Sequence, residues 1–237
     1  MRRPFFPMML AGATLRDRLF ACIGGVIGVA LTSLVCAMAL HGSEPLLLLV
    51  APIGASAVLI FAVPASPLAQ PWSVVGGNII SALVGVTAAR FVPIPYLAAG
   101  VAVGGAILVM SLLRCLHPPG GAAALTAVIG GPSVLEAGYA FPLVPVGVNS
   151  LILILAGIAF HRVSGHSYPH RAVPVVGHKL AASELSIPHP LDIDLALADL
   201  GETFDVSRED LDLLFRRVEF HAASRAASGI LDRRPRT

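Results

Sequence analysis

The sequence predicts an all-α, polytopic helical membrane bundle, and its composition and charge distribution support this prediction. Apolar residues make up 56% of the 237 residues, charged residues make up 13%, and the mean hydropathy is +0.82. A soluble domain carries about 25% charged residues. Residues 19–160 contain four charged residues, Glu44, Arg90, Arg114 and Glu136. This distribution excludes an ordinary soluble enzyme.

Five apolar segments approach the length of about 20 residues that a helix needs to cross a bilayer. They are residues 19–40, 46–63, 72–89, 96–116 and 143–160. The first ends at the polar turn 41–44, the third ends at Arg90, and the second is interrupted from Pro52 onward. A sixth run, residues 119–130, has 12 residues. As a helix it would measure about 18 Å against a core of about 30 Å, so it is either a half-helix or a re-entrant segment.

Arginine placement predicts the orientation in the membrane. The N-terminal arm, residues 1–18, carries Arg2, Arg3, Arg16 and Arg18, and arginines recur just after the last apolar segment. Positive residues favour the cytoplasmic side, so we expect both termini in the cytoplasm of a multi-pass protein of the cell inner membrane. Two cytoplasmic ends need an even number of crossings, which favours six, with a short fifth, over five. The predicted domains are the arm, a transmembrane domain (19–162), a linker (163–190) and a helical cytoplasmic tail (191–237).

Two broken segments suggest an internal repeat. Residues 52–57 (PIGASA) align with residues 119–124 (PGGAAA) at an offset of 67, and residues 75–78 align with residues 146–149 at an offset of 71. Each repeat would hold three crossings, an odd number, so the second would be inverted relative to the first. Inverted repeats with broken helices are typical of transporters whose site lies near the membrane midplane.

The Pro-Gly breaks predict an anion site. A helix that begins near Gly54 or Gly121 directs backbone N–H groups and the positive end of its dipole toward whatever precedes it. Two such ends would bind an anion without any formal charge. The alternative is that the small residues serve close helix packing alone.

Three polar side chains in apolar surroundings are further candidates. A histidine at membrane depth is a functional candidate, and the titration range of His117 suits proton-linked transport, although it could instead cap the fourth helix at the interface. Asn78 and Asn149 occupy related repeat positions and either line a pathway or bond between helices. The candidate site residues are Pro52, Gly54, Ala55, Ser56, Asn78, His117, Pro118, Pro119, Gly120, Gly121, Ala122 and Asn149.

The motifs in residues 66–72 (SPLAQPW), 76–85 (GGNIISALVG) and 116–122 (LHPPGGA) resemble the HPP family of integral membrane proteins, named for its His-Pro-Pro motif. The resemblance covers roughly residues 15–162 and implies nitrite transport. It also implies site roles for His117 to Gly121 and for Pro52, Gly54, Ala55 and Ser56. Many family members continue into paired CBS domains. Because we recognise no such pair before Thr237, regulation by nucleotides through them is in doubt.

The tail predicts a helical region. Ser207 is a suitable N-cap, and Leu211, Leu214, Phe215 and Val218 form an apolar stripe that we expect to support a homodimer. The histidines from His161 onward are irregularly spaced in a Pro-rich stretch, which favours a solvated linker over a metal site. The net charge of +2 gives no reason to expect a nucleic-acid partner, and no cofactor or metal is expected.

The leading hypothesis is therefore a transporter or channel for a small monovalent anion such as nitrite. One alternative is a membrane scaffold or sensor read out through the tail. A remote third is an intramembrane hydrolase that uses Ser56 and His117, although no acidic residue is evident to orient the histidine.

Overall fold

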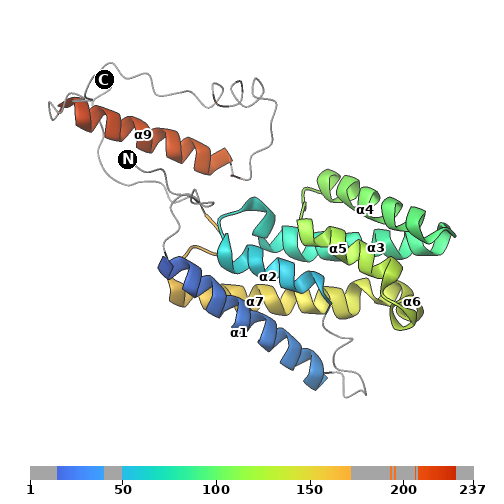
Figure 1. Ribbon diagram of the computed structural model, residues 1–237. Helices are drawn as coiled ribbons and strands as arrows, with labels where there is room; N and C mark the ends of the chain where they lie inside the picture. Colours follow the sequence, from blue (N-terminus) through green and yellow to red (C-terminus); the bar gives the residue numbers. More distant parts are fainter. Residues whose placement is uncertain are drawn as a thin grey trace, which may run out of the picture. The chain divides into compact units, whose positions relative to one another are not determined.

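The computed structural model describes residues 15–39, 50–171 and 208–227, together with 193, 195 and 206. Its regular elements are all helices, which confirms the all-α prediction for this part of the chain (Figure 1). The chain divides into two units, Met1–His170 and Arg171–Thr237. Each unit is considered by itself below.

Among the described residues, four helical stretches are long and apolar enough to cross a membrane. They are α1 (Leu15–Ala39), α3 (Pro71–Phe91), α4 (Pro95–Leu112), and η4 with α7 (Pro142–Gly147 and Val148–Ser164). Two apolar helices are shorter, α2 (Pro52–Ala62) and α5 (Pro118–Ile129). Their 11 and 12 residues correspond to about 16 and 18 Å, roughly half a hydrocarbon core. A polytopic helical membrane protein is therefore confirmed, while the choice between five and six crossings stays a prediction.

Proline begins most of these helices. Its φ angle is already helical, and the N–H that it lacks would have no partner within the first turn. In an apolar environment this start avoids an unsatisfied donor, which would otherwise be costly. The helices with proline in the first two positions are η2 (Pro67–Ala69), α2, α3, α4, α5, α6 (Pro132–Ala137) and η4.

Helix α3 lies at the centre of the first unit, in contact with α4, α5, η4 and α7 (Figure 1). Small residues allow the α3–α5 contact to be close. A Cβ added to Gly77 would lie 2.6 Å from the Cβ of His117, and one added to Gly85 would collide with the backbone of Ala124. Close approach of backbones through small residues is the usual way in which membrane helices associate.

The two halves pack in a related way. Helix α1 contacts α2 and α7, and α4 contacts α5 and α3, so the first helix of each half lies against the last helix of the other. The predicted repeat positions Pro52 and Pro119 both fall at the start of a short helix. Between α5 and η4 the chain forms α6 and η3 (Gly138–Ala140), whereas the α2–α3 connection contains only η2. Inversion of one half relative to the other stays a prediction.

The outer surfaces of the helices are apolar, and their interior carries no formal charge among the described residues. Large exposed apolar side chains lie along α1 and α4, whereas the buried polar side chains of this unit are serines, threonine, asparagines and histidines. This distribution is the one a bilayer demands, because lipid contacts the outside of the bundle and a charged side chain is costly at depth.

In the second unit, α9 spans Arg208–Ala227, with Glu209 and Asp210 in its first turn. Leu214, Phe215 and Val218 are exposed, so this part of the predicted apolar stripe is present. Ser207 and most of the predicted linker lie outside the described residues. The predicted homodimer through this helix stays a prediction.

Candidate functional site

His117 occupies the N-cap position of α5 and is fully buried. Its backbone is extended (φ −143°, ψ 106°) because a residue before proline avoids the helical region. The chain therefore turns at His117 and the helix begins at Pro118. The His-Pro-Pro sequence fixes both the end of the connection and the start of the helix.

Both ring nitrogens of His117 have partners. Nδ1 lies 2.8 Å from the carbonyl oxygen of Leu68, and Nε2 lies 2.8 Å from Ser56 Oγ. A carbonyl oxygen can only accept, so Nδ1 carries the proton and donates it to Leu68. In the neutral ring Nε2 then accepts the hydroxyl proton of Ser56. The two contacts thus fix the tautomer.

The loop that presents Leu68 is held by its own side chains. Ser66 Oγ accepts from the backbone N–H of Leu68 at 3.1 Å, and Gln70 Nε2 donates to the carbonyls of Pro64 and Ser66 at 3.0 and 2.8 Å. Ser73 Oγ donates to the carbonyl of Pro67 at 2.9 Å. These bonds orient the carbonyl group that selects the His117 tautomer.

Asn78 extends the network from α3 to two other helices. Its Nδ2 donates to Ser56 Oγ on α2 at 3.2 Å and to Ser150 Oγ on α7 at 3.0 Å. Ser150 in turn donates to the carbonyl of Val146 at 2.8 Å. We call Ser56, Asn78, His117 and Ser150 the polar cluster; all four side chains are fully buried. It joins α2, α3, α5 and α7 without any formal charge.

Two buried polar atoms beside the cluster have no hydrogen-bond partner within the described chain, Asn78 Oδ1 and Ser81 Oγ. The two residues are three positions apart on α3 and so share a face. A Cβ added to Gly120 would lie 2.6 Å from Ser81 Oγ, so this face lies against the start of α5. An unsatisfied buried polar group costs about 1–3 kcal/mol, and a ligand can supply the missing bonds.

The structure brings together only part of the predicted site. Ser56, Asn78 and His117 are in direct contact, and the Pro52 carbonyl lies 3.2 Å from Ser56 Oγ. Pro119 and Gly120 are also buried. Asn149 is buried but bonds elsewhere, to the Pro145 carbonyl at 2.6 Å and to Cys36 at 3.8 Å. Gly121 is half-buried, while the residues on the outer faces of α2 and α5 are Gly54, Ala55, Pro118 and Ala122.

The expectation that Gly54 offers a free N–H to an anion is wrong. Its N–H donates to the Ala51 carbonyl at 3.1 Å, and the N–H of Ile53 donates to Val50 at 3.0 Å. At α5, Pro118 and Pro119 have no N–H and that of Gly120 donates to the His117 carbonyl at 2.8 Å. The tight first turns satisfy these donors internally, so side chains rather than these N–H groups remain for a ligand.

Sequence reasoning missed Ser81, Ser150 and the Leu68 carbonyl. Ser81 lies three residues after Asn78, so helical spacing could have placed it on the same face. Ser150 is next to Asn149, and the repeat alignment drew attention to the asparagine alone. A backbone carbonyl in a loop leaves no sequence signal.

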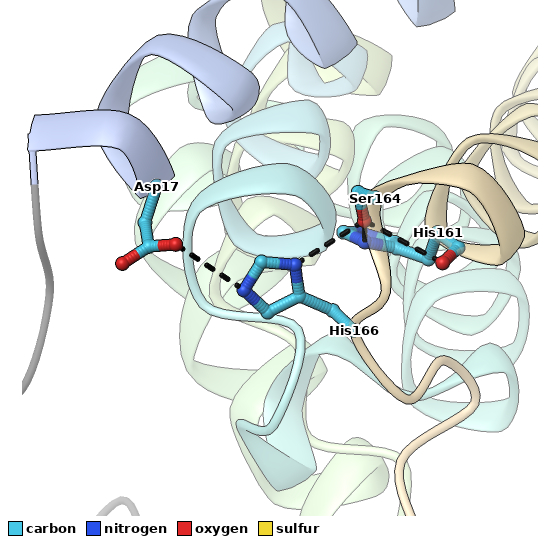
Figure 2. Close-up of polar contacts among 4 residues, drawn as sticks. All are labelled: Asp17, His161, Ser164 and His166. Atoms are coloured by element: carbon cyan, nitrogen blue, oxygen red, sulfur yellow. Dashed lines mark hydrogen bonds and ion pairs between the residues drawn. The ribbon is translucent and has the colours of Figure 1, made fainter.

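A second group of polar residues lies at the end of α7. His161 Nε2 donates to the Ile60 carbonyl at 2.9 Å, and Ser164 Oγ lies 3.0 Å from His161 Nδ1 and 3.2 Å from His166 Nδ1. His166 Nε2 is 3.7 Å from Asp17 Oδ1. Figure 2 shows the contacts among Asp17, His161, Ser164 and His166. The prediction that the histidines from His161 onward lie in a solvated linker is wrong for His161, which is buried within α7.

The chain after α7 returns to the loop between α2 and α3. Tyr168 donates its hydroxyl proton to the Ala69 carbonyl at 2.8 Å, and the His170 N–H donates to Gln70 Oε1 at 2.9 Å. Burial raises the pKa of Tyr168 above its ordinary value. Among the described residues, no three His, Cys, Asp or Glu side chains converge as metal ligands would.

Comparison with known proteins gives a family match and two relatives. The family described as HPP, transmembrane region, matches residues 11–169. A transmembrane protein of Dictyostelium discoideum is 38% identical over 130 residues, which cover 51% of this chain and 44% of the relative. A second transmembrane protein of that organism is 41% identical over 110 residues, covering 44% of this chain and 34% of the relative. The chain thus spans less than half of either relative. No solved structure matches.

Proposed function

The chain belongs to the HPP transmembrane family, and on that premise we propose that it carries a small monovalent anion, nitrite, across a membrane. The polar cluster is the observation that supports this proposal. It gathers hydroxyl, amide and imidazole groups from four helices in the interior of an apolar bundle. In a membrane protein such groups are costly unless they bind one another or a substrate.

The chemistry of the cluster favours a small ion of single charge. Ser81 beside the cluster carries a hydroxyl without a partner in the described chain, and nitrite oxygens accept hydrogen bonds. The described interior has no arginine or lysine to balance a multiply charged anion. Discrimination would come from dimensions and hydrogen-bond geometry. We propose the cell inner membrane as the location, with both termini in the cytoplasm.

The intramembrane hydrolase is the weaker alternative, although Ser56 Oγ does lie 2.8 Å from His117 Nε2. In serine hydrolases a carboxylate holds the second ring nitrogen and stabilises the imidazolium that forms. Here that nitrogen donates to the neutral Leu68 carbonyl. We therefore propose transport and not catalysis for the Ser56–His117 pair.

A membrane scaffold or sensor is the other alternative. The bonds from Tyr168 and His170 to the loop at Ala69 and Gln70 favour it, because they connect the chain beyond α7 to the loop that holds His117. This connection would equally suit regulation of a transporter by the tail. Transport accounts for the partner-free hydroxyl of Ser81, which can donate to an anion and which a scaffold leaves unexplained.

Nitrite flux into liposomes that contain the purified protein tests the proposal. We expect flux above that of protein-free vesicles, and at least a tenfold loss in Ser56→Ala. Ser111→Ala is the matched control, because Ser111 lies on the exposed face of α4 and donates only to its own helix, at Ile107 O. Absence of flux in the wild-type protein, or equal loss in both variants, would contradict the proposed site.

A further inference from the structure

We propose that the polar cluster carries one proton with each anion, because protonation of His117 converts the cluster from an acceptor site into a donor site. This inference rests on the proposed transport of an anion and names its coupling ion. The inference rests on two ends of one chain of hydrogen bonds. At one end the Leu68 carbonyl fixes the direction of the bonds, and at the other end the buried oxygen of Asn78 has no partner within the described residues.

With neutral His117, every bond in the chain points the same way. Asn78 donates to Ser56, Ser56 donates to Nε2 of His117, and Nδ1 donates to Leu68. The amide of Asn78 therefore uses its N–H groups on Ser56 and Ser150 and presents its oxygen to the face that it shares with Ser81. A carbonyl oxygen in that position repels an anion.

With protonated His117, Nε2 must donate, and its hydrogen-bond partner within the described residues is Ser56 Oγ. The hydroxyl proton of Ser56 then leaves the ring for one of two acceptors, the Pro52 carbonyl at 3.2 Å or the Asn78 amide. An anion beside Ser81 selects the second, because the amide accepts this proton by rotating through a half turn, which exchanges two atoms of nearly equal size and directs its N–H groups to the anion. Ser150 can likewise turn its hydroxyl from Val146 to the amide oxygen.

The rotated amide presents two N–H donors beside the hydroxyl of Ser81. An anion bound there meets the donors of Asn78 and Ser81 and, one serine away, the positive charge of His117. The same heavy-atom positions thus hold an anion only when the histidine is charged. On uptake, a proton from hydronium or nitrous acid on the aqueous side moves to Nε2, so an O–H bond breaks as the N–H bond forms. On release, this proton leaves His117 together with the anion.

Few other ionisable groups surround His117 that could take this role. Helices α2 and α5 and the turn η2 contain none, and α3 contains one, Arg90, in its last turn. Tyr96 on α4 and Arg114 are exposed, and Cys115 is buried two residues before the ring. Tyr168 bonds to the carbonyl of Ala69, next to Leu68. Among the described histidines, His117 is the one whose partner also contacts Asn78.

The direct test compares two driving forces on the wild-type protein in vesicles that contain a pH-sensitive dye. One set receives an inside-alkaline pH gradient, and the other receives an inside-positive potential set by potassium and valinomycin. Movement of one proton with one anion is electrically neutral. We therefore expect the pH gradient to drive nitrite entry with acidification of the interior, and the potential to have no effect. Protein-free vesicles give the background from nitrous acid that crosses the bilayer unaided.

The outcomes separate this inference from the proposed function. Entry driven by the potential, without acidification, would leave nitrite transport standing and overturn proton coupling. No entry under either gradient would contradict transport itself and the inference with it.

A variant pair tests the relay within the cluster. Ser56→Ala removes the link between His117 and Asn78, so we expect the acidification that accompanies entry to fall at least tenfold, while Ser56→Thr keeps a hydroxyl and restores it. Ser111→Ala should behave as the wild type. Coupling that survives in Ser56→Ala would overturn the relay. If that variant does not fold, the gradient experiment decides alone.

Discussion

The two buried histidines of the first unit, His117 and His161, bond to the same kinds of group but lie in different surroundings. Each ring donates from one nitrogen to a backbone carbonyl, Leu68 for His117 and Ile60 for His161, and each other nitrogen contacts a serine. The serine beside His117, Ser56, accepts a hydrogen bond from the buried Asn78, which also bonds to Ser150. The serine beside His161 leads outward to His166 and Asp17, at the end of α7 (Figure 2).

The contrast shows that a histidine–serine pair does not define a function by itself. The next contact of the serine decides whether the pair belongs to a buried polar cluster or stabilises the end of a helix. Ser56 continues to an amide whose oxygen has no partner within the described chain. Ser164 continues to His166, which is partly exposed and adjacent to a carboxylate. We therefore propose transport for the first pair and structural support for the second.

Substitution of the two histidines should give the largest contrast. We expect His117→Gln to lower nitrite flux at least tenfold, because glutamine cannot take up a proton. His161→Gln should stay within about twofold of the wild type in flux, although each variant loses about 1–3 kcal/mol from disturbed buried bonds. Flux and thermal unfolding measured on the same preparations check this. Equal flux losses would remove the distinction between the two pairs.

Glycine substitutions at the start of α5 should have the next largest effect. A Cβ on Gly120 would lie 2.6 Å from Ser81 Oγ and 3.0 Å from the Gly77 carbonyl. We expect Gly120→Ala to destabilise the fold by about 1–3 kcal/mol through overpacking. Gly121→Ala is the matched control, because its nearest neighbour would be Val103 at 3.9 Å. Unfolding temperatures in detergent measure both, and similar values would show that α3 and α5 do not approach each other so closely.

Tyr168→Phe should have a smaller, pH-dependent effect. The loss of the bond to Ala69 costs about 1 kcal/mol near neutral pH. Burial raises the pKa of Tyr168, so the folded protein favours the neutral phenol. This contribution is fully present below the ordinary tyrosine pKa of about 10 and is lost as the pH rises above it. Stability measured from pH 8 to 11 should therefore fall more steeply in the wild type than in the variant, and parallel curves would contradict this.

Substitution at the exposed edge should have the smallest effect. His166→Ala removes a partly exposed contact with Asp17 and one with Ser164. Exposed pairs of this kind contribute about 0–1 kcal/mol, so we expect little change in unfolding temperature and none in nitrite flux. A large fall in flux would show that the His161–Ser164 pair and its contacts also take part in transport.

The sequence was sufficient to predict the helices, because a bilayer demands long apolar segments and prolines mark where they begin. It was also sufficient to identify Ser56, Asn78 and His117, since polar groups stand out in an apolar chain. It could not predict which of them meet. Gly54 and Ala55 belong to the same motif as Ser56 but lie on the outer face of α2, and only the rotation of the helix separates them.

Asn149 shows the same limit from the repeat. The alignment made it the repeat counterpart of Asn78, but its amide donates to the Pro145 carbonyl in the preceding η4, while the adjacent Ser150 contacts Asn78. A difference of one residue rotates a side chain by about 100° around a helix. The choice between neighbours therefore depends on packing that repeat spacing does not specify.

The two prolines at the start of α5 restrict how this protein can move. A residue before proline avoids the helical region, so the sequence disfavours continuation of α5 through His117 toward α4. The break is therefore built into the sequence and is poorly suited to a hinge that winds and unwinds. The movement that this arrangement favours is displacement of α5 as a rigid body against α3, along the glycines of their contact.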